Sequence, residues 1–155
     1  MTRELNTDGT VMLRTARDLA CEARMQRTLE ARWKIKLHRY PDLYALDWWA
    51  ERDRRVTAFL EGKGYNFSSE QFPRYYLALR KWTALQLNCV GTGLPGCFVC
   101  GWTDCLTFID IQQVDPRQCE VGGRRDRGLP NDIEPIIMVP ANEWTRVDYL
   151  DEGGI

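Results

Sequence analysis

An acid and a base stand two positions apart within the hydrophobic stretch AFLEGKGYNF, residues 58–67. Successive side chains of a β-strand point to opposite faces, so Glu61 and Lys63 share one face and Gly62 lies on the other. The carboxylate and the ammonium are therefore neighbours. The chemistry open to them depends on which other group joins them.

The group predicted to join them is an aspartate on the preceding strand. The segments LYALDWWA (43–50) and VTAFLEGKG (56–64) have the composition of strands, and the charged turn ERDRR separates them. They are predicted to form a hairpin. With Arg54 at the middle of the turn, Asp47 pairs opposite Glu61. Two carboxylates then converge beside one lysine.

Two carboxylates at this distance favour a divalent cation between them. Without one they repel, and one of them tends to take up a proton. Mg²⁺, or Mn²⁺ in its place, is bound by one or two carboxylates together with water and substrate phosphate. Such a metal can neutralise a phosphodiester and help to ionise the attacking water. Lys63 would orient or deprotonate that water, or stabilise the charge that develops on phosphorus oxygens.

The surrounding sequence predicts the elements that position these residues. The apolar spacing of residues 11–32 indicates a helix with Thr10 as its cap, and residues 75–93 indicate a second helix that ends at glycines. Strands are predicted at 34–41, 43–50, 56–64, 96–104 and 105–114. Residues 115–132, rich in Gly, Arg and Asp, are predicted as a long loop. Residues 134–144 are expected to add an edge strand bounded by Pro135 and Pro140.

This order of elements and the spacing of Asp47, Glu61, Gly62 and Lys63 resemble the PD-(D/E)XK nuclease superfamily. The resemblance covers roughly residues 15–115 and is greatest to small phage-encoded nuclease-like proteins. It implies an α/β fold with a restriction-endonuclease-like αβββαβ core, in which helices flank a mixed central sheet. It also implies a metal-dependent enzyme that hydrolyses phosphodiester bonds of DNA.

The resemblance assigns roles to particular residues. Asp47 and Glu61 would be metal ligands and Lys63 the catalytic lysine. A glutamate of the first helix would complete the metal site, with Glu22 preferred to Glu30 because it lies on a side that could face the sheet. Lys81 would be an auxiliary lysine that points toward the site. A literal Pro-Asp pair ends at Asp42, but hairpin pairing would place that residue opposite Asn66, beyond the site.

Length and composition bound the organisation of the chain. Its 155 residues are 44% hydrophobic and 28% charged, which suits one globular domain. We expect a flexible arm at 1–10, a single nuclease-like domain at 11–150 and a frayed tail at 151–155. The polar start and the lack of a long apolar run predict neither a membrane helix nor a secretory signal, and hence a cytoplasmic protein, in the host cytoplasm if phage-encoded.

The net charge and the cysteines bear on other functions that the chain could have. A net charge of −1 and a pI near 5.9 exclude a nucleic-acid coat protein. Local contacts to DNA phosphates could come from Arg124, Arg125 and Arg127. The spacing of Cys97 and Cys100, with Cys105 following, could indicate zinc or redox chemistry, but a strand would place the first two on opposite faces, which favours core packing. The single histidine, His38, is predicted to lie on the surface.

A second function from another class fits the same sequence. A phage or mobile-element protein could keep the nuclease fold without activity and act by binding another protein, such as a host factor or a virion component. The acidic balance, the six tryptophans and the Arg/Gly-rich loop support this alternative. A protein partner or a homo-oligomer is therefore expected beside DNA, and no membrane.

Overall fold

The computed structural model describes residues 3–5, 11–13, 15–42, 44–126, 128 and 130–150, with the backbone alone described at 3–5, 11–13 and 131. The elements in chain order are β1 (Arg3–Leu5), β2 (Val11–Leu13), α1 (Ala16–Trp33), β3 (Lys36–Arg39), β4 (Trp48–Arg52), β5 (Arg55–Gly64), β6 (Arg74–Ala78), α2 (Leu79–Thr92), β7 (Gly96–Gly101), β8 (Leu106–Asp110), η1 (Ile111–Gln113), β9 (Cys119–Gly123), η2 (Pro130–Asp132), β10 (Ile133–Pro140), η3 (Ala141–Glu143) and β11 (Thr145–Val147). The predicted order of helix, three strands, helix and two strands is present from α1 to β8, with one additional strand, β6, before the second helix. None of the helices described here has the length and apolar character needed to cross a membrane. The predicted tail at 151–155 lies outside the described residues.

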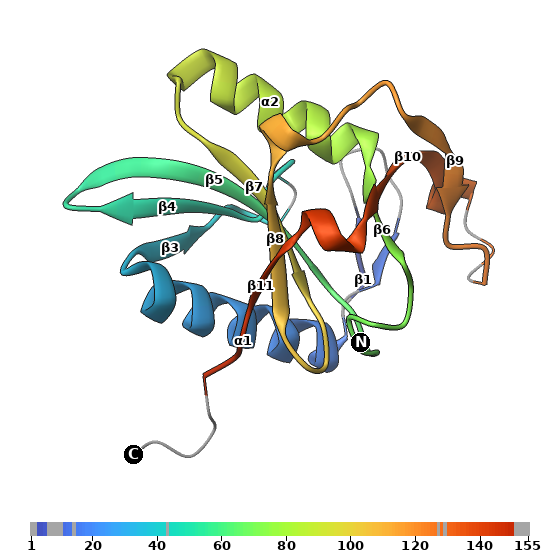
Figure 1. Ribbon diagram of the computed structural model, residues 1–155, viewed down its shortest axis with the longest axis horizontal. Coiled ribbons are helices and arrows are strands. Elements are labelled where there is room, and N and C mark those ends of the chain that lie inside the picture. The colour runs from blue at the N-terminus through green and yellow to red at the C-terminus, as the bar shows by residue number, and fades with distance from the viewer. Residues whose placement is uncertain are drawn as a thin grey trace.

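A six-stranded mixed sheet forms the middle layer. Its strand order is β11-β8-β7-β5-β4-β3, with β5 and β7 parallel and the other neighbours antiparallel. The two helices lie on opposite faces of this sheet, with α2 at the top of the view and α1 at the bottom (Figure 1). Parallel neighbours need a crossover connection, and α2 is the helix of that connection. The mixed sheet flanked by helices is therefore confirmed.

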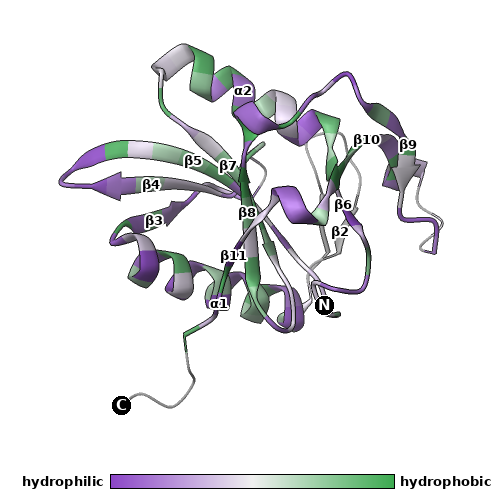
Figure 2. Ribbon diagram, viewed as in Figure 1, coloured by the Kyte–Doolittle hydropathy of each residue, from purple (hydrophilic) through white to green (hydrophobic). Residues whose placement is uncertain are grey.

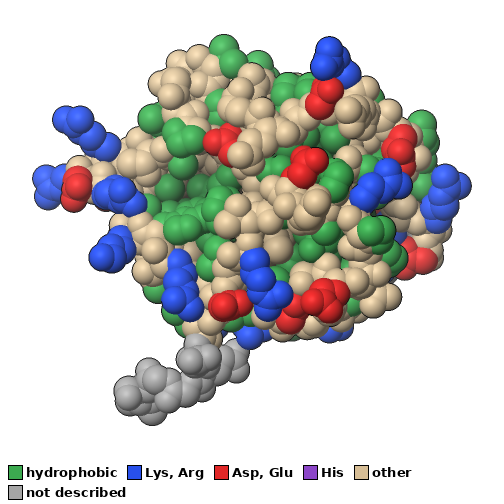
Figure 3. Space-filling model, viewed as in Figure 1, with side chains coloured by type: hydrophobic (Ala, Val, Ile, Leu, Met, Phe, Trp, Pro, Cys, Tyr) green, Lys and Arg blue, Asp and Glu red, His purple; other side chains and the backbone are tan. Residues whose placement is uncertain are grey.

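The β4–β5 hairpin turns at a different point from the one predicted. Its two turn residues are Asp53 and Arg54, whose φ angles are 53° and 63°. Left-handed backbone at both positions is typical of the tight hairpin turn whose twist matches that of the strands. Arg54 is thus one of two central residues and not the midpoint. Basic side chains project around this tip at the left of the molecule (Figure 3).

The pairing at the far end of the hairpin nevertheless agrees with the prediction. An irregularity between Ala50 and Glu51 shifts the register by one residue, and Trp48 then pairs with Leu60. The next positions outward are Asp47 and Glu61. The shift offsets the difference at the turn, so the two carboxylates come to adjoining positions on β4 and β5.

The first helix begins later than predicted. The hydroxyl of Thr15 accepts a hydrogen bond from the Asp18 backbone N–H, and the Asp18 carboxylate accepts one from the Thr15 N–H. This reciprocal cap fixes the start of α1 at Ala16, so the predicted cap at Thr10 is wrong. Residues Val11–Leu13 instead pair as β2 with β1, which lies in the stretch predicted as a flexible arm.

The second helix also begins later, because its first predicted turn is a strand. Tyr75 and Leu77 of β6 are buried while their neighbours are more exposed, which is the alternation of a strand and not the period of a helix. The helix α2 then runs to Thr92. It ends at Gly93, whose φ of 72° is a left-handed conformation that glycine adopts without strain.

A second sheet lies beside the first and was not predicted. It has three antiparallel strands in the order β6-β10-β9. The stretch predicted as an edge strand contributes β10, which is the central strand of this sheet, and the predicted loop at 115–132 contains β9. The edge of the main sheet is formed by β11, which the sequence did not predict.

The main sheet separates two hydrophobic clusters. The α1 cluster contains Met25 and Trp48, and the α2 cluster contains Leu85 and Phe98. The strands between them, β7 and β8, are the most continuously hydrophobic part of the ribbon (Figure 2). Burial on both faces explains why these strands read as apolar runs without alternation.

Gly62 makes the close packing of α1 against β5 possible. A Cβ at this position would lie 2.6 Å from Cη2 of Trp48 and 3.0 Å from Cε of Met25. The residue between Glu61 and Lys63 therefore faces α1, as its position in the strand predicted. Those two side chains consequently face α2.

We expect Gly62→Ala to lower the free energy of unfolding by about 1–3 kcal/mol, because the added methyl group overpacks the α1 cluster. Gly91→Ala is the matched control. Gly91 lies in α2, and a Cβ added there would meet no atom within 4 Å, so alanine leaves stability unchanged or raises it by up to about 1 kcal/mol. Urea denaturation of both variants measures the difference, and equal stabilities would contradict this account of Gly62.

Candidate active site

Glu61 and Lys63 open into a small pocket between β5, β6 and α2. Its volume is about 120 Å³, and its walls include Tyr76 of β6 and both Arg80 and Lys81 of α2. The strand β5 supplies the acid, and the crossover helix brings a lysine over it from the first turn. Three consecutive elements of the chain thus supply Glu61, Lys63, Tyr76 and Lys81.

The Glu61 carboxyl group is buried, with 7% of the residue exposed. Burial is the main cause that raises its pKa to about 8, and the negative charge of Asp47 raises it further. Lys81 opposes both effects. A carboxylate in this environment is stabilised by positive charge placed next to it.

Lys81 provides one such charge. Its ammonium lies 2.7 Å from Oε1 of Glu61 and also donates to the Ala45 carbonyl oxygen at 2.9 Å. The second contact fixes the lysine to the loop that leads into β4. The structure thus brings Lys81 to Glu61, and its role in catalysis stays a prediction.

Asp47 lies at the neighbouring position with one oxygen committed. Its Oδ2 accepts a hydrogen bond of 2.8 Å from the Gly62 backbone N–H, which holds the carboxylate against β5. On Glu61, Oε2 is buried and has no hydrogen-bond partner among the described residues. Buried oxygens normally have a partner, so this atom is available to accept a bound cation or a water molecule.

These donors fit a hard divalent cation. Carboxylate oxygens are the ligands that Mg²⁺ and Mn²⁺ prefer, and one or two of them suffice when water and phosphate complete the shell. No third His, Cys, Asp or Glu completes a metal-binding cluster within the residues that the structure describes. The site therefore offers a two-carboxylate set, with Asp47 and Glu61 as its members.

Lys63 lies beside these carboxylates and is held by a tyrosine. Its Nζ donates to the Tyr76 hydroxyl at 2.6 Å and lies 4.1 Å from the centroid of the same ring. The lysine is otherwise exposed. Sequence reasoning missed Tyr76 because it placed this residue in a helix, and the strand-like alternation of RYYLA was the signal that could have found it.

The candidate helix acids are engaged elsewhere. Glu22 lies on α1, on the side of the sheet opposite to Glu61, and its Oε2 accepts from Arg39 at 2.7 Å. The alternative, Glu30, accepts the backbone N–H of Leu37 at 2.8 Å. The structure does not bring either acid together with Asp47 and Glu61. Asp42 likewise pairs with Arg39, in agreement with the preference for Asp47.

Two of the three arginines proposed as phosphate contacts, Arg124 and Arg125, directly follow β9 of the second sheet. The Arg124 guanidinium donates two hydrogen bonds to the Asp126 carboxylate, and this pairing raises the pKa of Arg124. The Tyr76 hydroxyl also influences the pKa of Arg124. Arg125 is exposed. Arg127 lies outside the described residues. Of the three, only Arg124 is linked to the site by a described interaction.

The cysteines belong to the core. Cys97 packs against the α1 cluster and Cys100 belongs to the α2 cluster, so the two thiols point to opposite faces as predicted. Burial raises the pKa of each thiol to about 12. Both are therefore thiols at neutral pH, the form that binds metal poorly.

Comparison with known proteins identifies the class to which this fold and site belong. The model of a family described as phage putative PDDEXK endonuclease matches residues 11–147. The chain belongs to that family, and the resemblance seen in its sequence is confirmed.

Other comparisons add little. Among solved structures, the Holliday junction resolvase Hjc of the archaeal hyperthermophile Archaeoglobus fulgidus is similar over 61% of this chain and 79% of its own, with 16% identity and a TM-score of 0.46. A comparison with curated protein sequences gives no match.

The raised pKa of Glu61 predicts a dependence of stability on pH in metal-free protein. The folded state binds this proton more tightly than the unfolded state, whose carboxyl titrates near 4.5. The stabilisation is therefore complete below about pH 4.5 and is lost as pH rises to about 8. We expect the stability of the wild type relative to Glu61→Gln to fall across pH 5–8 by an amount on the order of a few kcal/mol.

Urea denaturation in EDTA at several pH values measures this difference. Glu143→Gln is the control, because Glu143 is exposed on η3 and its substitution leaves the pH profile of the wild type unchanged. Parallel profiles for the wild type and Glu61→Gln would contradict the assignment.

Proposed function

We propose that the protein is a divalent-metal-dependent nuclease that hydrolyses phosphodiester bonds of DNA. The observation that carries the proposal is the buried Glu61 carboxylate, which has an unpartnered oxygen and lies beside Asp47 in a member of a phage endonuclease family. Lys81 pairs with this carboxylate, and Lys63 lines the same pocket with its ammonium on the Tyr76 hydroxyl. A structural ion pair would need only Lys81.

Asp47 and Glu61 would hold the cation. When bound, Mg²⁺ or Mn²⁺ supplies positive charge that stabilises the phosphodiester oxygens during displacement. The hydrogen bond from the Gly62 N–H to Oδ2 keeps the Asp47 carboxylate in place. Glu61 loses its proton when the cation binds, because the cation replaces the missing positive charge.

Lys63 would act on the attacking water. Its ammonium is positioned by the Tyr76 hydroxyl on the same face as Glu61, on the open side of the pocket. As a compact donor it can orient the water, and a neutral amine in its place can accept the proton that the water loses. Tyr76 is then a positioning residue, because it acts through Lys63.

Lys81 and the start of α2 would meet the phosphate. The N-cap residue Ala78 provides no side-chain acceptor for the first N–H groups of the helix. That end of the helix lines the pocket together with Arg80 and Lys81. Backbone N–H groups and the helix dipole favour an anion at this place. Lys81 can turn from Glu61 to phosphate once the cation neutralises the carboxylate.

Lys63→Ala is expected to reduce the rate of DNA cleavage in Mg²⁺ by about 100-fold or more, the usual effect of losing a proton-transfer group. The double variant Asp47→Ala, Glu61→Ala should abolish cleavage. Lys36→Ala is the matched control, because Lys36 is an exposed lysine of β3 and its loss leaves the rate unchanged. Plasmid and oligonucleotide substrates, with circular dichroism to verify folding, provide the measurement.

The same variants distinguish the second function. If the wild type cuts no DNA with Mg²⁺ or Mn²⁺, and the double variant keeps the biological activity of the phage protein, the proposal is wrong. The nuclease fold would then serve to bind another protein.

Metal binding can be measured without activity. We expect Mn²⁺ to bind the wild type in calorimetric titrations and to release close to one proton per ion between pH 6 and 7, because Glu61 is protonated there before binding. Glu61→Gln removes the proton release and weakens binding at least about tenfold, the factor that a metal site loses when one ligand is weakened. Glu143→Gln serves as the control, and identical titrations for all three proteins would refute the site.

A further inference from the structure

A second and larger hollow adjoins the candidate site. Its volume is about 310 Å³, and its walls are mainly aromatic. The rings that line this aromatic pocket are Tyr65, Phe67, Phe72, Tyr75, Tyr76 and Trp102. Phe72 stands at its opening with 51% of the residue exposed, and Arg74 adds a positive charge to the rim.

The aromatic pocket and the candidate site share a wall. Tyr76 lines both hollows, and Lys63 of the candidate site lies 4.1 Å from the centroid of Tyr76 and 5.7 Å from that of Tyr65. A group in the pocket is thus one ring away from the lysine assigned to the attacking water. The pocket and the candidate site are therefore close enough to bind two parts of one substrate.

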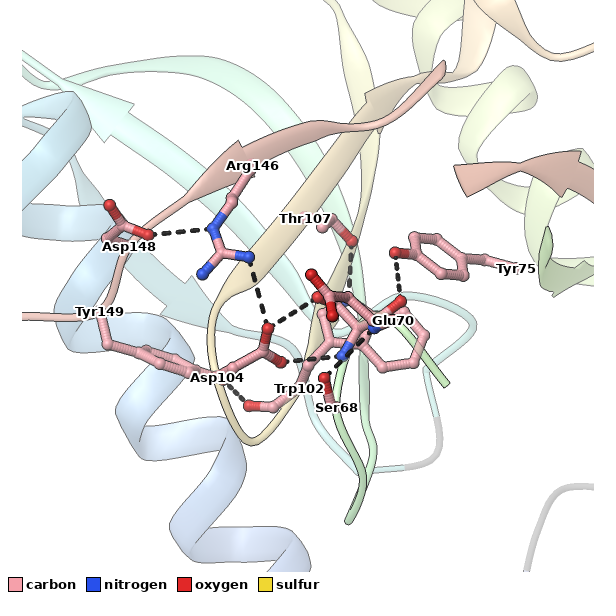
Figure 4. Close-up of polar contacts among 10 residues, drawn as sticks. Ser68, Glu70, Tyr75, Trp102, Asp104, Thr107, Arg146, Asp148 and Tyr149 are labelled. Atoms are coloured by element: carbon pink, nitrogen blue, oxygen red, sulfur yellow. Dashed lines mark hydrogen bonds and ion pairs between the residues drawn. The ribbon is translucent and has the colours of Figure 1, made fainter. Parts of the chain in front are cut away.

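The rings are held in place before anything binds. Tyr65 stacks on Trp102 with centroids 4.3 Å apart and planes within 7°. The Trp102 indole N–H donates to the Thr107 hydroxyl at 2.8 Å. Tyr75 donates its hydroxyl hydrogen bond to the Ser69 carbonyl oxygen (Figure 4).

The loop that carries Phe67 and Phe72 is anchored at Ser69. Both its backbone N–H and its hydroxyl donate to the Asp104 carboxylate, at 2.8 and 2.7 Å. Arg146 on β11 contacts the same carboxylate, so the anchor links three separate segments (Figure 4). A preformed pocket of this kind is typical of ligand sites.

We propose that the aromatic pocket binds one unpaired nucleobase of the DNA strand whose phosphate lies at the candidate site. The inference rests on the proposed nuclease function and adds a substrate class to it. A nucleobase is flat and presents a π-face to the exposed ring of Phe72, and the adjoining phosphates would meet Lys63 and Arg74. An aliphatic side chain of a protein would use the apolar walls but not these cations.

The pocket predicts a preference among DNA structures. A base in a single strand, a flap or a branch enters it directly, whereas a base in a perfect duplex must first be unstacked and unpaired. The protein should therefore bind and cut DNA with unpaired bases better than intact duplex. The residues of the aromatic pocket would then set the preference for an unpaired base, and those of the candidate site would cut the DNA. The two properties can therefore be tested separately.

The test compares DNA binding by the wild type, Phe72→Ala and Leu87→Ala in EDTA, followed by fluorescence anisotropy. Leu87 is the matched control, since it is an exposed apolar residue of α2 outside the pocket. Phe72→Ala should weaken binding to single-stranded DNA about 10- to 100-fold, the loss of one base stack, with a much smaller change for duplex. Phe72→Trp should restore binding.

An abasic site moved along the strand provides the second measurement. In the wild type, one position should lower affinity as much as Phe72→Ala does, and in Phe72→Ala no position should matter.

If the wild type cuts DNA but Phe72→Ala and Leu87→Ala share its affinities and preferences, this inference fails while the nuclease function stands. If no DNA is bound or cut, the proposed function fails first. If light scattering shows that Phe72→Ala only changes the oligomeric state, the pocket holds a second copy of the chain and the inference is again overturned.

Discussion

The interaction on which the site depends is the burial of the Glu61 carboxyl group next to Asp47. A buried charge is unfavourable unless it is paired, and two neighbouring carboxylates need positive charge between or beside them. The protein supplies part of that charge with Lys81 and leaves one oxygen of Glu61 without a partner among the residues that the structure describes. In the proposed nuclease, this remaining need for charge would favour a divalent cation over water at the site.

The architecture of the sheet follows from the same requirement. Glu61 can face a helix only because β5 lies inside the sheet, between the antiparallel β4 and the parallel β7. The parallel partner requires a crossover, and the crossover helix α2 brings Lys81 over the acid. Gly62 permits α1 to close on the other face. The positions of Glu61, Asp47 and Lys81 thus all follow from this one arrangement of strands.

The parts of the site that are local in sequence could be predicted, and the parts that depend on distant contacts could not. Asp47, Glu61 and Lys63 follow from strand alternation and one hairpin, and the register at Glu61 was right although the turn was misplaced. Tyr76 was missed because β6 runs directly into α2, so that helical spacing appeared to begin too early. Glu22 was assigned by resemblance and by its side of the helix, and its pairing with Arg39 depends on how α1 lies against β3. The order of the elements could be predicted from hydrophobic periodicity. The second sheet could not, because it forms through contacts between segments about 60 residues apart.

The unpredicted second sheet changes what the site can recognise. Without β6, Lys63 would lose the Tyr76 hydroxyl that holds it, and the ring of Tyr75 would not lie beside Trp102. The chemistry of hydrolysis requires only the carboxylates and the lysines, which the helix and hairpin already provide. Selection of the DNA to be cut requires a surface beyond them. Under the proposed function, residues 65–78 between β5 and α2 would build that surface, and base recognition and hydrolysis would meet at the pair formed by Lys63 and Tyr76.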